Sequence, residues 1–123
     1  MRQVRTEGTR PEILLRRALV LEGATIRTND PDLPGTPDVV LPALRLAVFV
    51  HGCFWHGCQA HWRPPRTRTA FWVGKVQRNR LRDARSIRWL SELGWDTLVV
   101  WEHDLPDQEE ARRVARAVLR RRR

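Results

Sequence analysis

The chain has 123 residues and a mass of 14.5 kDa, the size of one domain, spanning residues 1–123, with one hydrophobic core. Hydrophobic residues at 41% and charged residues at 30% are typical of a globular protein and exclude a disordered one. No apolar run is long enough to cross a membrane and no signal peptide is evident, so we expect a cytoplasmic protein.

The net charge indicates the class of partner. Lys and Arg number 23 against 14 Asp and Glu, which gives +9, and every cation except Lys75 is an arginine. A coding bias accounts for the choice of arginine but not for the sign of the charge, and a small domain this basic attracts polyanions. Part of the excess lies in a basic tail at 120–123, for which solvation is a sufficient explanation. Nucleic acid is the favoured partner.

The first half of the chain predicts one helix and three strands. After a flexible arm at 1–8, Thr9, Pro11 and Glu12 form a capping-box pattern, and apolar residues at helical spacing extend the helix until Gly23. The segment 29–37 is rich in Asp, Pro and Gly and predicts a loop. Three strands are expected: Ala24–Thr28, Asp38–Leu41 and Arg45–His51.

The second half predicts two helices around a further strand. A long loop at 52–68 precedes a helix that Thr69 caps and Gly94 ends. Its inward residues are expected to be Val76, Leu81, Ala84, Ile87, Leu90 and Leu93. A buried strand, Trp95–Trp101, and a basic helix, Gln108–Arg121, follow. The order predicts an α/β (α+β) fold, a central mixed sheet of about four strands flanked by helices.

Both cysteines and three of the four histidines fall between His51 and His61, in or directly before the long loop. Cys53, Cys58, His61 and the distant His103 supply four ligands of the kinds that zinc binds tetrahedrally, so we expect a structural zinc that staples the loop to the end of the last strand. The alternative is a pair of buried cysteines without a metal and scattered surface histidines.

Asp38 is a second candidate for chemistry, since an aspartate that opens an apolar strand is costly if buried without a partner. One interpretation is an Asx hydrogen bond that caps the preceding turn. The other is a carboxylate that holds Mg²⁺ against a phosphate and an attacking water.

Other side chains allow more than one interpretation. His51 and His56 are outside the proposed zinc set, so they are available as proton carriers near neutral pH. The adjacent Phe54 and Trp55 can either insert into a base stack or cover the metal site. The capping box is a sufficient explanation for Glu12.

Several ordered motifs resemble the very short patch repair (Vsr-type) DNA mismatch endonucleases. The similarity runs from about Arg5 to Leu105. The motifs that carry it are Thr9-x-Pro11-Glu12, Leu33-Pro34-Gly35-x-Pro37-Asp38, Val48-Phe49-Val50-His51-Gly52-Cys53-Phe54-Trp55-His56-Gly57, Phe71-Trp72-x-x-Lys75, Asn79-x-x-Arg82-Asp83, Leu93-Gly94-Trp95 and Val100-Trp101-Glu102. The resemblance implies a restriction-endonuclease-like fold. In that fold's usual signature an acidic residue and a lysine follow the Pro-Asp, and here Phe49-Val50-His51 stands in their place.

The resemblance also implies roles for metal-site residues. Asp38 would be the Mg²⁺ carboxylate, the Val50 backbone carbonyl a further ligand, and Glu12 part of the water network around the metal. His103 stands where a cysteine is common in the family, which makes the implied zinc set Cys2His2.

Further roles concern the reaction and the DNA. By resemblance, His56 is the general base, and His51, supported by Asp83, orients the reacting phosphate. Phe54 and Trp55 match residues that intercalate beside the mismatch. Family members often carry a longer N-terminal helix that clamps the DNA. In this sequence, only a few residues precede Thr9.

The function implied is a Mg²⁺-dependent nick on the 5′ side of the thymine in a T:G mismatch, which leaves 3′-hydroxyl and 5′-phosphate ends. The expected protein is a monomer that works on nucleoid DNA, with mismatch-repair proteins as possible partners. One alternative is a restriction or defence nuclease for matched or modified DNA. Another is a zinc-stapled DNA-binding module without catalysis.

Overall fold

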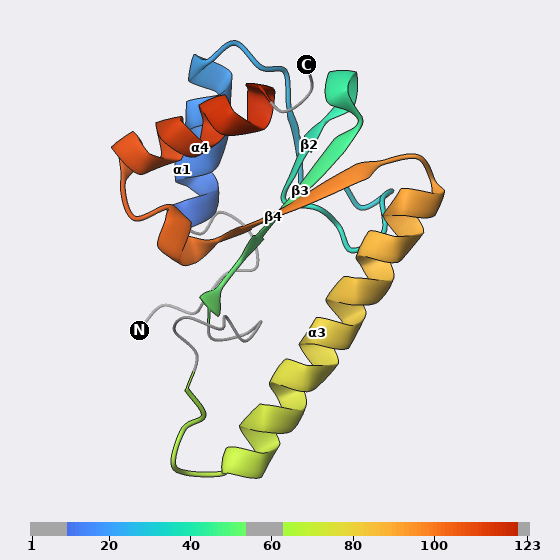
Figure 1. The fold of residues 1–123 in the computed structure, drawn as a ribbon, viewed down its shortest axis with the longest axis vertical. Helices are drawn as coiled ribbons and strands as arrows, with labels where there is room; N and C mark the ends of the chain where they lie inside the picture. Colours follow the sequence, from blue (N-terminus) through green and yellow to red (C-terminus); the bar gives the residue numbers. More distant parts are fainter. Residues whose placement is uncertain (1–9, 54–62, 121–123) are drawn as a thin grey trace.

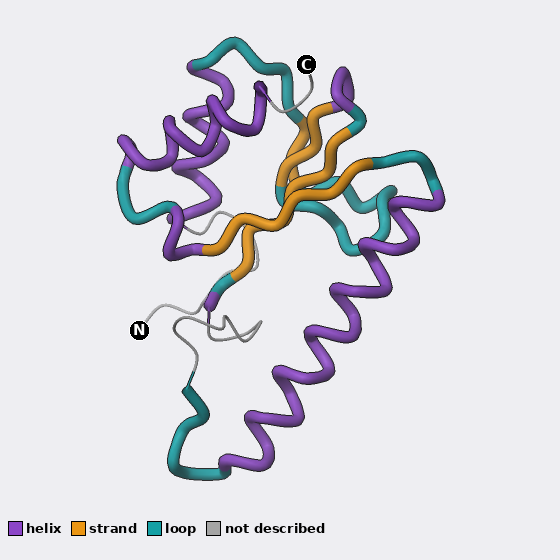
Figure 2. The backbone as a smooth tube through the Cα atoms, in the orientation of Figure 1, coloured by secondary structure: helices purple, strands orange, loops and turns teal. Residues whose placement is uncertain are grey.

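The computed structural model describes residues 10–53 and 63–120. Within them the element order is that expected from the sequence: a helix, three strands, a helix, a strand and a helix (Figures 1 and 2). The elements are α1 (Arg10–Leu21), β1 (Arg27–Thr28), β2 (Val39–Leu41), η1 (Pro42–Leu44), β3 (Leu46–His51), α3 (Thr69–Glu92), β4 (Asp96–Trp101), η2 (Glu102–Asp104) and α4 (Gln108–Arg120). The proposed arm at 1–8, the Thr9 cap and the tail from 121 lie outside the described residues.

The four strands form one mixed sheet, as predicted, and their order in it is β1-β2-β3-β4. β1 with β2 and β2 with β3 are antiparallel, whereas β3 and β4 are parallel. Val39 is opposite Val48 in one pairing, and His51 is opposite Trp101 in the other. The amino end of β2 and the carboxyl ends of β3 and β4 therefore meet at the same edge of the sheet.

Helices cover both faces of this sheet (Figure 1). One face packs against α1 and α4, because Leu15 and Leu19 of α1 and Ala115 of α4 belong to the same buried cluster as Val39 and Val48. On the other face, Ala47 and Phe49 pack against Leu90 of α3. β2 and most of β3 are consequently buried, as their apolar sequences predict.

The predicted inward face of α3 is wrong in part. Val76 and Leu90 are buried, but Leu81 is 61% exposed, Leu93 is 48% exposed, and Ala84 also faces solvent. Figure 1 shows that the amino-terminal part of α3 extends beyond the sheet, whereas the carboxyl-terminal part, which carries the buried Leu90, lies beside it. Apolar residues at helical spacing are buried only where another element lies against them.

Two further expectations are corrected. The residue that caps α3 is Arg68, in a left-handed conformation, and Thr69 is the first helical residue, with its hydroxyl donating to the Pro65 carbonyl at 2.7 Å. β4 is less buried than its composition suggested, and Val100 is its one buried residue. The reason is that β4 is an edge strand of the sheet that the described residues form.

The helix ends fall close to the predicted glycines: α1 stops two residues before Gly23 and α3 two residues before Gly94. None of the helices within residues 10–53 and 63–120 has the length and apolarity required to span a membrane.

Candidate active site at the strand ends

The sheet topology gathers the predicted site residues at one edge. Asp38 directly precedes β2, and His51 is the last residue of β3. Cys53 follows β3 and His103 follows β4. Because these two strands are parallel, both residues lie at the same edge of the sheet. α1 brings Glu12 to the same region from its first turn. β3 pairs with β2 in the antiparallel direction and with β4 in the parallel direction, so residues that are far apart in the sequence lie at the same edge of the sheet.

Asp38 lies beside a second carboxylate. Its Oδ2 accepts a hydrogen bond from the Val50 N–H at 2.7 Å, and its side chain is hydrogen-bonded to that of Glu12, which is only 2% exposed. Burial, with the hydrogen bond to Glu12 and the negative charge of Glu12, raises the pKa of Asp38 to about 8. The Val50 N–H and the Arg16 guanidinium act in the opposite direction on this pKa. Two carboxylates that share a hydrogen bond in a poorly solvated place form a donor set suited to a hard divalent cation.

The strand register leaves the Val50 carbonyl available beside this pair. Both the N–H and the C=O of a strand residue point toward the same neighbouring strand, so the Val50 carbonyl faces β2 as its N–H does. Continuing the register beyond Val39 and Val48 places Pro37 opposite Val50, and proline has no N–H to donate. The ladder therefore supplies no donor to this carbonyl, and three oxygen groups, from Glu12, Asp38 and Val50, fit a Mg²⁺ site.

Two polar residues that the motifs did not indicate also belong to this site. The Arg16 Nη2 lies 3.4 Å from the Glu12 Oε2, 2.6 Å from the Asn29 Oδ1 and 3.4 Å from the Asp38 backbone oxygen. Arg16 is four residues after Glu12 on α1, a spacing that places both side chains on one helix face. That spacing is the only signal in the sequence that pointed to Arg16.

His51 and Asp83 are brought together, as the resemblance implied. The His51 Nε2 is 3.8 Å from the Asp83 Oδ2, which comes from α3, and His51 is 7% exposed. The ring packs edge-on against Trp101, with centroids 5.2 Å apart and planes at 78°. The imidazole is thus held by a carboxylate on one side and by an aromatic ring of the next strand on the other.

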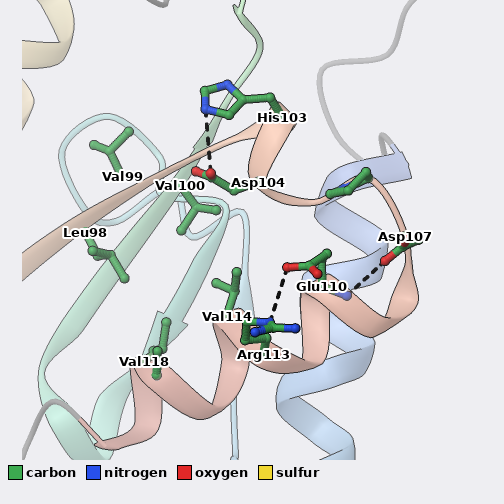
Figure 3. A pocket seen from close by; sticks show the side chains of 12 residues that line it. Leu98, Val99, Val100, His103, Asp104, Asp107, Glu110, Arg113, Val114 and Val118 are labelled. Carbon is green, nitrogen blue, oxygen red and sulfur yellow. Dashed lines mark hydrogen bonds and ion pairs between the residues drawn. The ribbon is translucent and has the colours of Figure 1, made fainter. Parts of the chain in front are cut away.

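Half of the predicted zinc set lies in the described residues, and its geometry suits a metal. The Cys53 Sγ is 3.3 Å from the His103 Nδ1. Two ligands of one tetrahedral zinc, at about 2.3 Å for sulfur and about 2.0 Å for nitrogen, lie roughly 3.5 Å apart. The other ring nitrogen, Nε2, faces the Asp104 Oδ1 at 3.6 Å (Figure 3). A histidine that binds zinc commonly has its second nitrogen oriented by a carboxylate in this way.

The remaining predicted residues lie outside the described residues. These are Phe54, Trp55, His56, Cys58 and His61. Among the residues that are described, no group of three or more His, Cys, Asp or Glu side chains is placed to hold a metal. Glu102 fixes the backbone at Cys53, because its Oε1 accepts a hydrogen bond from the Cys53 N–H at 2.6 Å.

A pocket of about 810 Å³ lies between β4 and α4, away from this carboxylate pair. Val100, Val114 and Val118 are among its apolar lining residues and Asp107 and Glu110 among its acidic ones (Figure 3). His103 is the only predicted site residue that lines it. The candidate chemistry is therefore at the strand ends and not in this pocket.

The amino-acid sequence is similar to those of known DNA endonucleases. The sequence model of the family described as DNA mismatch endonuclease Vsr matches residues 1–62. A type II nicking enzyme, V.XorIIP of Xanthomonas oryzae, is 46% identical over 109 residues, 87% of this chain and 79% of the relative. The DNA mismatch endonuclease Vsr of Escherichia coli is 42% identical, over 89% of this chain and 71% of the relative. A type II nicking enzyme, V.NmeAIP of Neisseria meningitidis, is 34% identical, over 98% and 86% respectively.

Proposed function

Since the chain belongs to the Vsr family of DNA mismatch endonucleases and is an endodeoxyribonuclease, we propose that it nicks one strand of duplex DNA on the 5′ side of the thymine in a T:G mismatch, by Mg²⁺-dependent hydrolysis. The products are a 3′-hydroxyl and a 5′-phosphate. The fold proposed for residues 1–123 is a single restriction-endonuclease-like domain, acting as a monomer in the cytoplasm on nucleoid DNA.

The observation that carries this proposal is the pair of facing carboxylates, Glu12 and Asp38, next to the Val50 carbonyl. Hydrolysis of a phosphodiester needs a deprotonated water in line with the leaving oxygen and a compensation for negative charge on the phosphate. Bound Mg²⁺ supplies both, by lowering the pKa of water and by neutralising charge. Asp38 binds it with the Val50 carbonyl, and Glu12 holds the surrounding water.

The two histidines divide the proton chemistry. His56 accepts the proton of the attacking water at a ring nitrogen. Asp83, with its Oδ2 3.8 Å from the His51 Nε2, orients the His51 ring and stabilises a positive charge on it, so that an N–H of the ring can donate to a phosphate oxygen. No covalent intermediate is required, which leaves the cysteines to bind zinc.

The zinc and the aromatic pair complete the proposal. Cys53, Cys58, His61 and His103 hold a structural Zn²⁺, supported by the 3.3 Å separation of Cys53 and His103. Phe54 and Trp55 insert beside the mismatch, where a wobble pair costs less to unstack than a matched pair. Mismatch-repair proteins are the proposed partners on the damaged duplex.

A second candidate function is supported by the names of the relatives, several of which are type II nicking enzymes. In this alternative the same carboxylates cut matched or modified DNA. A module that only binds DNA is the remaining alternative, and it leaves the Glu12–Asp38 pair without a use.

A strand-resolved nicking assay separates the three functions. We expect Mg²⁺-dependent cutting of one strand of a T:G duplex, little cutting of a T:A duplex of the same sequence, and none with EDTA. Asp38→Ala should abolish nicking and leave DNA binding intact. Equal rates on both duplexes would favour the restriction-type alternative. If wild type and Asp38→Ala bind DNA equally and neither nicks either duplex, only the binding module remains.

A further inference from the structure

One guanidinium is shared by the two carboxylate-bearing segments of the proposed Mg²⁺ site. The Arg16 Nη2 contacts the Glu12 Oε2 at 3.4 Å and the Asp38 backbone oxygen at 3.4 Å. The Arg16 side chain is 19% exposed, and its Nε is buried without a hydrogen-bond partner among the described residues. Burying an arginine with one donor unsatisfied costs free energy, so its contacts to Glu12 and Asp38 need an explanation.

Asn29 orients this guanidinium. Its Oδ1 accepts the shortest hydrogen bond of the Arg16 Nη2, at 2.6 Å, and its own N–H donates to the Asp38 backbone oxygen at 3.2 Å. Asn29 follows β1 with a φ of +47°, a left-handed conformation that asparagine tolerates better than most residues. Arg16 and Asn29 thus tie α1, the end of β1 and the backbone at Asp38 to one another.

We propose that Arg16, oriented by Asn29, is a positioning residue that holds Glu12 and Asp38 in the arrangement that binds the divalent cation. This inference rests on the proposed function, since it concerns the same site. Arginine has no acceptor and does not itself bind a cation. Its contact with Glu12 is to Oε2 and its contact with Asp38 is to the main chain, so it fixes both residues without occupying the Asp38 carboxylate.

A role in charge balance makes the opposite prediction. If Arg16 merely supplied a positive charge that competes with the cation, its removal would tighten cation binding. If it positions the ligands, its removal weakens binding, because partners behind metal ligands typically contribute 10–100-fold in affinity. The sign of the change therefore distinguishes positioning from charge balance.

The test measures Mn²⁺ binding to the whole chain without DNA, by electron paramagnetic resonance of the free ion. We expect Arg16→Met to raise the Mn²⁺ dissociation constant about tenfold or more, and Arg16→Lys to recover part of the loss. Asn29→Ala, which changes no charge, should also raise the Mn²⁺ dissociation constant. The matched control is Arg17→Met, which removes an equal charge from the exposed neighbouring position and should leave the dissociation constant unchanged.

The double variant of Arg16 and Asn29 gives a further test. Because Arg16 and Asn29 act as one unit, the double variant should bind Mn²⁺ no more weakly than Arg16→Met alone. Unchanged or tighter binding in Arg16→Met, or full affinity in Asn29→Ala, would overturn the inference, as would wild-type protein that binds no Mn²⁺. If wild type binds Mn²⁺ through Asp38, with the expected losses in the variants, but nicks no T:G duplex, the proposed function fails and the positioning role stands.

Discussion

At the residue scale, the proposed metal site is a place where the fold accepts an electrostatic cost. Asp38 has one N–H donor, from Val50, for a carboxylate that lies against Glu12. Burial and that neighbour raise the pKa of Asp38 to about 8 from 3.8. Without a divalent cation, ionisation of Asp38 at neutral pH therefore opposes folding, and a bound cation removes this penalty.

This cost predicts a pH dependence of stability. Because the folded state keeps the Asp38 proton up to a pH near 8 and the unfolded state loses it near 3.8, the free energy of unfolding in EDTA should fall as the pH rises through that window. The slope for one group reaches about 1.4 kcal/mol per pH unit. Asp38→Asn should be more stable than wild type at pH 8 and should lose this slope, as measured by urea unfolding.

The controls use the cation and another carboxylate. Mg²⁺ should stabilise wild type at pH 8 and have little effect on Asp38→Asn, because only a protein that binds the ion gains from it. Asp32→Asn removes an exposed carboxylate in the preceding loop and should keep the wild-type slope. Identical pH profiles for wild type and Asp38→Asn would contradict the raised pKa.

The residues that motifs missed also belong to this scale. The spacing from Glu12 to Arg16 is common on any helix, and Asn29 is one of several polar residues in a loop. Neither pattern indicates a site, because their roles depend on where α1 packs against the end of β1.

At the element scale, the turn before β2 positions Asp38 at the site. Gly35 has a φ of +79°, and a Cβ placed there would lie 2.8 Å from the Ser86 Cβ of α3 and 3.1 Å from the Phe49 ring. A side chain at this position would have to push the turn away from both the helix and the sheet. The Leu-Pro-Gly-x-Pro-Asp motif thus has a mechanical reason: its glycine allows close packing, and its second proline leaves the Val50 carbonyl unpaired by the ladder.

Substitution at Gly35 should therefore affect both stability and nicking. We expect Gly35→Ala to lower the free energy of unfolding by about 2–4 kcal/mol, from left-handed strain and steric overlap together. Nicking should fall as well, because the turn carries Asp38. Chemical unfolding and the nicking assay measure the two effects.

Two glycine controls separate the causes. A Cβ at Gly23, where φ is +94°, has no atom of the described residues within 4 Å, so Gly23→Ala should cost only the backbone strain, about 1 kcal/mol. Gly74 lies inside α3, and the one contact of a Cβ there with the part of the chain that the structure describes is with the end of Arg78, at 3.4 Å. Gly74→Ala should therefore stabilise the helix by about 0.5–1 kcal/mol. A Gly35→Ala protein no less stable than Gly23→Ala would refute the close contact.

At the scale of the whole molecule, the parallel pairing of β3 and β4 brings together two of the proposed zinc ligands. Cys53 follows β3 and His103 follows β4, and their side chains come within 3.3 Å. A structural zinc there would join the segment after one central strand to the end of the last strand. Such a link contributes to the stability of the whole fold, because the site does not exist in the unfolded chain.

Zinc content and thermal unfolding test this link. One equivalent of zinc should survive dialysis, and Cys53→Ser should lose it and lower the melting temperature, whereas His103→Cys should retain it because thiolate is also a good zinc ligand. Native protein without zinc, or zinc retained in Cys53→Ser, would exclude Cys53 as a ligand.

The amino-acid sequence alone determined the element order, the mixed sheet and the family, since these depend on local periodicity, turn residues and contiguous motifs. It also indicated Asp38, His51 with Asp83, and Cys53 with His103, because the first four belong to motifs and His103 directly follows one. Only the tertiary structure decided which side of α3 is buried and that Arg16 and Asn29 bridge Glu12 to Asp38. Burial and hydrogen bonding depend on which elements pack together in space, and residue spacing within one segment carries no information about a neighbour from another.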